Sequence, residues 1–133
     1  MPQVSKRILN PEIKQNILDA FSYVLKELKT KKDVDLFLST VLTETEQIML
    51  SKRVAAAFLL DRGVEEGKIS QTLKLTSATI SRLKMWINLR MDGFKVIFSK
   101  LVKKEKEGMA NELLQKVLNY AIKAAFGRVP KLF

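Results

Sequence analysis

The strongest constraint on the fold comes from residues 69–83, where apolar and polar residues follow the pattern of two short helices joined by a tight turn. The first helix is expected to end near Leu73. The second is expected to begin after Thr76, whose hydroxyl can cap the next turn. Only Lys74 and Leu75 lie between them. This spacing predicts a helix-turn-helix, a motif that many proteins use to contact DNA.

The second helix of this pair has one packing face and one small, polar face. At 100° per residue, Ile80, Leu83 and Ile87 fall on one side. The opposite side carries Ser77, Ala78, Ser81, Lys84, Met85 and Asn88. Short side chains allow close approach to base edges in the major groove, and hydroxyls can donate or accept hydrogen bonds there. We therefore expect Ser77, Ala78 and Ser81 to be the base-reading residues.

Basic and polar residues around the motif are candidate phosphate contacts, which set affinity and register but carry no sequence information. They are Lys52, Arg53, Lys68, Gln71, Thr76, Thr79, Arg82 and Lys84. An ordinary helical hairpin has the same spacing, and in that interpretation these side chains form a solvated face.

Composition narrows the function classes. The chain has 133 residues, 47% of them apolar, which suits one compact core. It contains no cysteine and no histidine, so it lacks thiolate ligands, the commonest general base and the commonest metal ligand. Asp33 and Asp35 have no partner base and are interpreted as charges at a helix start. We expect no enzyme activity, no metal site and no cofactor.

The formal net charge of +10 suits a polyanionic partner, because basic side chains displace counterions from phosphates. The charge is uneven: residues 93–133 carry 9 basic and 3 acidic groups, whereas residues 63–92 carry 5 and 3. The sequence shows neither an apolar run of about 18 residues nor a signal-peptide core. We expect a cytoplasmic protein with no membrane span.

Two further helices are predicted before the motif. Asn10, Pro11 and Glu12 supply a cap, a proline at the first helical position and an early acid, so a helix should run to about Leu28. Its apolar stripe is Ile13, Ile17, Phe21, Val24, Leu25 and Leu28. Residues 29–32 are predicted to form a loop, followed by a short helix over residues 34–41.

A third helix is predicted to open with a capping box formed by Thr43 and Glu46. It should end near Arg62 and Gly63, where glycine accepts a left-handed helix stop. Its expected inward residues are Ile48, Val54, Ala55, Phe58 and Leu59.

The C-terminal part is predicted to be a basic helical extension. A helix break is expected at Asp92 and Gly93, which gives a domain of residues 1–92, with the motif at about 65–90, and an extension of residues 93–133. One stripe of the extension is Phe94, Ile97, Phe98 and Leu101, beside Lys95, Lys100, Lys103, Lys104 and Lys106. After Gly108, a second segment over about 109–126 has the stripe Leu114, Val117, Leu118, Ala121, Ile122 and Ala125, and Gly127 and Pro130 end it. The two helices could pack on the rest of the protein, contact flanking DNA or attach to a membrane surface.

The motif also carries a recognisable string. Residues 73–82 read L-x-L-T-x-A-T-I-S-R, which resembles a string found in bacterial helix-turn-helix regulators. Together with residues 42–46, Arg53–Val54 and Arg62–Gly63, it is similar in order and spacing to the Trp repressor family. The resemblance covers roughly residues 13–90. One position departs, because Lys74 stands where glycine usually tolerates positive φ.

The resemblance implies an all-helical fold in which the N-terminal helices interlock with those of a second copy. Such a homodimer would present two recognition helices to a palindromic site in double-stranded DNA, with half-sites about one helical turn apart. The residues alone leave open whether the stripe on the first helix packs within one chain. The implied function is transcriptional regulation, with repression as the family expectation.

The resemblance places Thr43, Arg53 and Arg82 at positions that line an amino-acid pocket, where one arginine meets the ligand carboxylate and the other stacks on its indole. Leu83 stands where the tryptophan-binding member has glycine, and Trp86 stands where it has serine. Both substitutions fill space. We expect Leu83 and Trp86 to occupy the pocket, so that no tryptophan corepressor binds. Alternatively, Trp86 packs in the core or at the dimer seam.

Two other functions share parts of this pattern. A sigma-factor-like module also has a capped helix before a helix-turn-helix. A protein-interaction scaffold could keep the helical hairpin without affinity for DNA, and the acidic residues Glu65 and Glu66 at the entrance of the hairpin favour that alternative.

Overall fold

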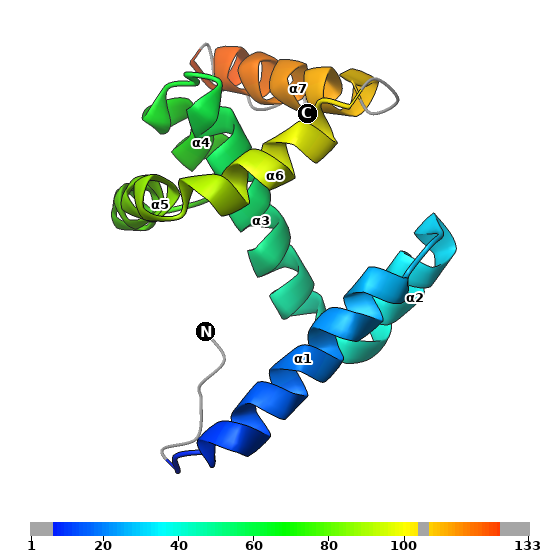
Figure 1. Cartoon of the computed structure of the whole chain (residues 1–133). Helices are drawn as coiled ribbons and strands as arrows, with labels where there is room; N and C mark the ends of the chain where they lie inside the picture. Colours follow the sequence, from blue (N-terminus) through cyan, green and yellow to red (C-terminus); the bar gives the residue numbers. More distant parts are fainter. Residues whose placement is uncertain (1–6, 104–106, 126–133) are drawn as a thin grey trace. The chain divides into compact units, whose positions relative to one another are not determined.

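The computed structural model describes residues 7–103 and 107–125, and within them it contains seven helices and no strand (Figure 1). The helices are α1 (Pro11–Glu27), α2 (Lys31–Val41), α3 (Glu44–Asp61), α4 (Glu66–Leu73), α5 (Ser77–Leu89), α6 (Met91–Leu101) and α7 (Glu107–Ala125). The predicted all-α class is confirmed. The chain divides into two compact units, residues 1–49 and 50–133, with the boundary inside α3. In the described part of the chain, no helix has the length and apolar character needed to span a bilayer.

Helix α1 follows its predicted bounds to within one residue. Oδ1 of Asn10 accepts hydrogen bonds from the backbone N–H groups of Glu12 (2.9 Å) and Ile13 (3.3 Å). The ring of Phe21 contacts that of Phe37 in α2, with centroids 5.8 Å apart. No residue of α1 is buried. The predicted stripe of α1 stays 43 to 54% exposed at Ile13, Ile17, Phe21, Val24 and Leu25.

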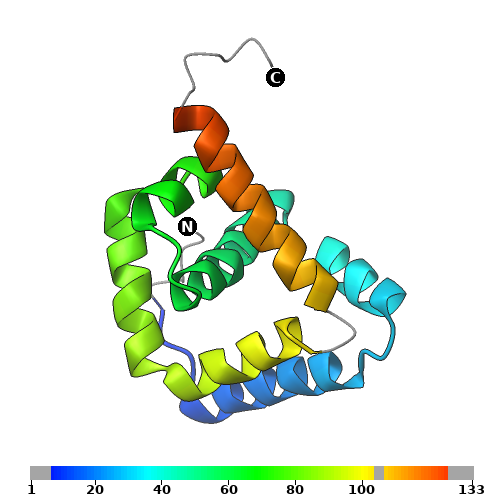
Figure 2. The same cartoon turned by 90° about the horizontal axis from the view of Figure 1, so that it is seen from above.

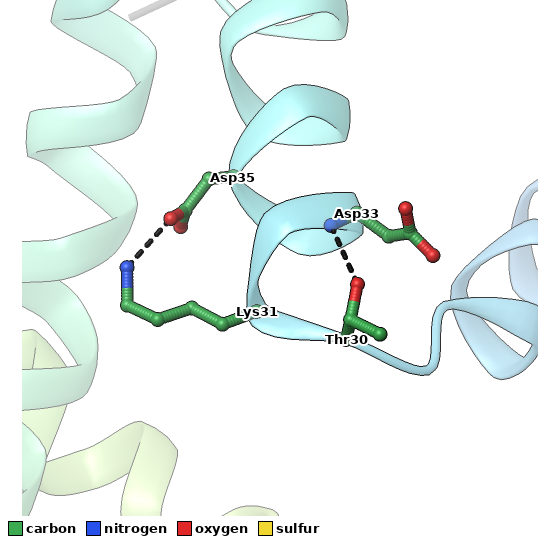
Figure 3. Close-up of polar contacts among 4 residues, drawn as sticks. All are labelled: Thr30, Lys31, Asp33 and Asp35. Carbon is green, nitrogen blue, oxygen red and sulfur yellow. Dashed lines mark hydrogen bonds and ion pairs between the residues drawn. The ribbon is translucent and has the colours of Figure 1, made fainter.

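Helix α2 begins three residues earlier than predicted, so the loop expected over residues 29–32 is too long. Oγ1 of Thr30 accepts a hydrogen bond from the N–H of Asp33 at 3.1 Å, and Nζ of Lys31 pairs with Oδ2 of Asp35 at 2.6 Å (Figure 3). The run of lysines suggested a loop. However, a threonine cap and an ion pair spaced four residues apart both favour a helix start at this point.

Helix α3 starts with the predicted capping box and stops at the predicted glycine. Oε1 of Glu46 accepts from the N–H of Thr43 at 2.9 Å, and Oγ1 of Thr43 accepts from the N–H of Glu46 at 3.1 Å. Beyond the helix, Gly63 has a φ of +79°. The N–H of Val64 donates to the carbonyl of Leu59 at 3.0 Å, which is the closing bond of a Schellman motif.

The core of the second unit gathers apolar residues from α3, α4, α5, α6 and α7. The ring of Phe98 contacts those of Phe58 and Phe94, with centroid separations of 6.0 Å and 5.8 Å. The buried set is Ala56, Ala57, Phe58, Leu59, Ile69, Ile80, Leu83, Ile87, Phe94, Phe98 and Val117. This core joins the α4–α5 pair to the end of α3.

The predicted inward face of α3 is right only at its C-terminal end. Phe58 and Leu59 are buried, whereas Val54 and Ala55 are half-buried. Ile48 is 48% exposed, so its predicted inward position is wrong in this chain. It lies in the unit of residues 1–49, where none of the described residues is buried. Periodicity shows which residues share a helix face, but it does not show whether anything covers that face.

The break between α5 and α6 lies at Arg90, so the break predicted at Asp92 and Gly93 is wrong. Arg90 has φ −126° and ψ 39°, and α6 runs through both predicted break residues. Asp92 occupies the first turn of α6, where a carboxylate is favoured by the helix dipole. A glycine in such a turn is tolerated, and Gly93 does not have positive φ. The predicted boundary between residues 1–92 and 93–133 stays a prediction.

Helix α7 confirms the second C-terminal helix and packs against α4 and α6 of the same chain (Figure 2). Its side chain Val117 is 2% exposed, and Leu113 and Leu114 pack beside the core. The other predicted positions of this region lie outside the residues or side chains that the structure describes: Lys104, Lys106, Ala121, Ile122, Ala125, Gly127 and Pro130.

Two glycines test the end of α3 and the course of α6: Gly63 has positive φ, whereas Gly93 lies inside a helix. We expect Gly63→Ala to lower the free energy of unfolding by about 1 kcal/mol, because alanine disfavours the left-handed region. Gly93 lies inside α6 with nothing within 4 Å of an added Cβ. Gly93→Ala should therefore raise the free energy of unfolding by about 0.5–1 kcal/mol, the usual gain in a helix. Urea denaturation followed by circular dichroism measures both changes. A change of the same sign in the two variants would contradict the assignments.

Candidate nucleic-acid interface

The turn between α4 and α5 is left-handed at Lys74, which has φ 57° and ψ 52°. Among the residues that the structure describes, Lys74 alone combines positive φ with a side chain other than glycine. The carbonyl of Ser70 accepts the N–H groups of Lys74 and of Leu75, the latter at 3.1 Å. Oγ of Ser70 donates to the carbonyl of Leu75 at 2.6 Å. Lys74 thus adopts the conformation that glycine would take at lower cost.

The start of α5 is fixed by two threonines. Thr76 is the predicted cap, and its Oγ1 accepts from the N–H of Thr79 at 3.1 Å. The same hydroxyl donates to Oγ1 of Thr79 at 2.9 Å. Both hydroxyls were predicted to contact phosphate; in the free chain they hold the first turn of the helix.

Helix α5 has the two faces that the sequence predicts. Ile80, Leu83 and Ile87 are 0, 5 and 8% exposed. The opposite residues, Ser77, Ala78, Ser81, Lys84, Met85 and Asn88, are all exposed. The candidate base-reading residues therefore lie together on the outer face of α5, at its N-terminal end.

One candidate phosphate contact is already paired with an acid. Nζ of Lys84 lies 2.7 Å from Oε2 of Glu66 in the first turn of α4, and the two side chains are 53% and 46% exposed. Such an exposed pair contributes roughly 0–1 kcal/mol. Lys84 therefore offers less positive charge to a phosphate than its position in the sequence suggests.

The other predicted phosphate contacts lie on three helices. Lys68 is half-buried and Gln71 exposed on α4, and Lys52 is half-buried on α3. Arg82 is exposed on α5, with Nη2 at 3.5 Å from Oγ1 of Thr79. The structure brings Arg82 together with the cap of α5.

Trp86 lies against two arginines. The guanidinium carbon of Arg53 in α3 lies 4.8 Å from the indole centroid, and that of Arg90 lies 6.0 Å away. The indole is 37% exposed, so it is not part of the buried core. Sequence analysis missed Arg90, although its spacing of four residues from Trp86 places the two on the same helix face.

The positions matched to an amino-acid pocket have different surroundings. Leu83 is buried in the core of its own unit, and Trp86 lies beside Arg53. Thr43 belongs to the unit of residues 1–49, where its side chain caps α3.

A hollow of about 620 Å³ opens beside the candidate interface, between the end of α3, the start of α4 and the second half of α5. Its lining is Leu60, Asp61, Gly63, Val64, Glu65, Glu66, Gly67, Lys84, Ile87, Asn88 and Met91. Three of these side chains are carboxylates, which disfavour a phosphate at the entrance of α4. In the described part of the chain, no group of three or more acidic side chains is placed to hold a metal ion.

The comparisons with known proteins agree with the residue pattern. The sequence model of one family, described as Trp repressor protein, matches residues 16–102, about two thirds of the chain. No curated protein and no solved structure matches the sequence of this chain. The match includes α2 to α6 and most of α1, and it ends before α7. This family indicates a DNA-binding transcriptional regulator, and the chain belongs to the Trp repressor family.

Proposed function

We propose that this chain binds double-stranded DNA at specific sequences and acts in the cytoplasm as a transcriptional repressor. The observation that carries the proposal is the outer face of α5, where Ser77, Ala78 and Ser81 are exposed while the opposite face is anchored in the core. In this arrangement α4 and α5 would form a helix-turn-helix, with α5 in the major groove and its hydroxyls at base edges. Family membership and the net charge of +10 support the same function.

The remaining predicted contacts would hold phosphates on either side of the groove. Lys68 and Gln71 would act from α4, Arg82 and Lys84 from α5, and Lys52 and Arg53 from α3. Each neutralised phosphate releases counterions, so affinity should fall as salt rises, with a slope of about −0.9 per contact.

Selection of bound sequences from random duplexes tests the proposal, and we expect enrichment of a site with two-fold symmetry. Ser81→Ala should change the preferred base at one position, since a good base contact is worth about 1–3 kcal/mol of discrimination. Lys84→Ala should weaken binding to all sequences alike and reduce the salt slope by at most about one, because Glu66 already pairs with its charge. Gel shifts at several salt concentrations measure both effects. Identical effects of the two substitutions would contradict the assigned roles, and the absence of both enrichment and salt-sensitive binding would favour a protein-interaction scaffold.

A second copy of the chain is the proposed cover for the apolar stripe of α1. Full burial of a side chain such as Ile17 or Phe21 contributes about 1.5–3 kcal/mol, and a continuous exposed stripe is unusual in a monomer. The stripe leaves five large apolar side chains 43 to 54% exposed. A symmetric dimer through this face would present two copies of α5 to a palindromic site.

Substitution of the stripe tests the dimer. Ile17 is 52% exposed in the middle of α1, and Ile17→Asp should convert a dimer to monomers because a carboxylate cannot be buried there without a partner. Ile8→Asp is the matched control, since Ile8 precedes α1 and is 95% exposed. Light scattering should give twice the chain mass for the wild type and the control. A wild-type mass of a single chain would refute the dimer.

We further propose that DNA binding needs no tryptophan corepressor. Arg53, at a position that the family resemblance assigns to the ligand pocket, already has an indole beside it, that of Trp86. Leu83, the other residue larger than its counterpart in the tryptophan-binding member, is 5% exposed in the core. Free tryptophan would have to displace these side chains in order to bind.

Calorimetry and indole rescue test this independence. The wild type should show no micromolar binding of free tryptophan. Trp86→Ala should lower operator affinity by about tenfold, because cation–π contacts are worth roughly 1–2 kcal/mol, and free indole should restore part of the loss. Leu89→Ala, which removes a side chain 78% exposed on the same helix, is the control and should not respond to indole. Micromolar tryptophan binding by the wild type would refute the proposal.

A further inference from the structure

Helix α7 reaches the turn between α4 and α5 through one pair of side chains. Nζ of Lys74 lies 5.4 Å from the ring centroid of Tyr120 and donates a hydrogen bond to its hydroxyl at 3.2 Å. Tyr120 lies on a helix that is anchored to the rest of the unit, because α7 packs against α4. Val117, three residues before Tyr120, is 2% exposed in the core. The pair therefore links a docked helix to the turn.

The contact with Tyr120 restrains the one residue of the turn whose backbone is left-handed, Lys74. Residues other than glycine disfavour left-handed backbone, so an unrestrained lysine would tend toward right-handed geometry. That change would redirect the chain as it enters α5, whose cap, Thr76, follows two residues later. The orientation of Ser77 and Ser81 thus depends on the backbone at Lys74.

Two features of this chain meet at this contact. Lys74 stands where related motifs usually have glycine, and α7 lies beyond residue 102, where the family match ends. The side chain at this left-handed position contacts a helix that lies outside the family match.

We infer that Tyr120 is a positioning residue for DNA recognition: through Lys74 it holds the left-handed turn and thereby fixes α5 relative to α4. The inference rests on the proposed DNA-binding function, but the restraint of the turn can be measured without DNA. In this role Tyr120 contacts no base. It limits the range of orientations that α5 can take.

Hydrogen exchange of the Leu75 amide reports on the turn, because this N–H donates to the carbonyl of Ser70. Tyr120→Phe removes the hydroxyl. Lys74→Met removes the ammonium but keeps an unbranched side chain one atom shorter and a residue other than glycine at the left-handed position. In the full chain, each variant should speed exchange at Leu75 by about three- to tenfold, as expected for the loss of a solvent-exposed cation–π contact or hydrogen bond.

A lysine on α7 supplies the matched control. Lys116 pairs with Glu112 of the same helix at 2.8 Å, so Lys116→Met removes a charge from α7 without touching the turn. Exchange at Leu75 should not change in this variant. Unchanged exchange in both Tyr120→Phe and Lys74→Met would overturn the inference whether or not the protein binds DNA.

Gel shifts on Tyr120→Phe test the link to recognition. Affinity for the selected operator should fall by about threefold or more, the loss of one hydrogen bond, while affinity for a random duplex stays the same. Faster exchange at Leu75 with an unchanged ratio of the two affinities would overturn the role in recognition. Faster exchange in a chain that binds no DNA would confirm the restraint of the turn and refute the proposed function, so the two failures are distinguishable.

Discussion

The buried end of α3 is the constraint on which the second unit depends. Phe58 and Leu59 are almost fully buried, and the ring of Phe58 contacts that of Phe98 in α6. Full burial of one such side chain contributes about 1.5–3 kcal/mol, whereas an exposed pair such as Lys84 with Glu66 contributes roughly 0–1 kcal/mol. Apolar packing therefore fixes α5 on the core, and the polar contacts adjust its orientation.

Local signals predicted most of the fold. The cap at Asn10, the box of Thr43 with Glu46 and the stop at Gly63 each depend on residues that are close in sequence, and all three are present. The errors arose where a local signal has two meanings. The lysines before α2 suit a loop as well as a capped first turn. Asp92 suits a break as well as a helix start. The Thr30 cap decides for a helix at α2, and Asp92 lies in the first turn of α6.

The candidate site could be predicted in part. The exposed face of α5 follows from helical periodicity, so the exposure of Ser77, Ala78 and Ser81 was predicted from the sequence. The partners of the charged side chains around α5 could not be predicted from the sequence. The pairs Lys84–Glu66, Arg53–Trp86 and Lys74–Tyr120 join residues 18, 33 and 46 positions apart, and such contacts depend on how the helices pack. No local pattern encodes that packing.

Three positions at which this chain departs from the pattern that the family resemblance implies share one physical consequence. Lys74, Leu83 and Trp86 are each larger than the glycine or serine that the family resemblance places there. In the structure each large side chain has a contact: Lys74 with Tyr120, Leu83 with the core, and Trp86 with Arg53. If α5 contacts DNA as proposed, a helix held by its own chain in this way loses less freedom on binding, which lowers the entropic cost of binding. A chain with glycine or serine at these positions would need another source of the same restraint, such as a bound ligand.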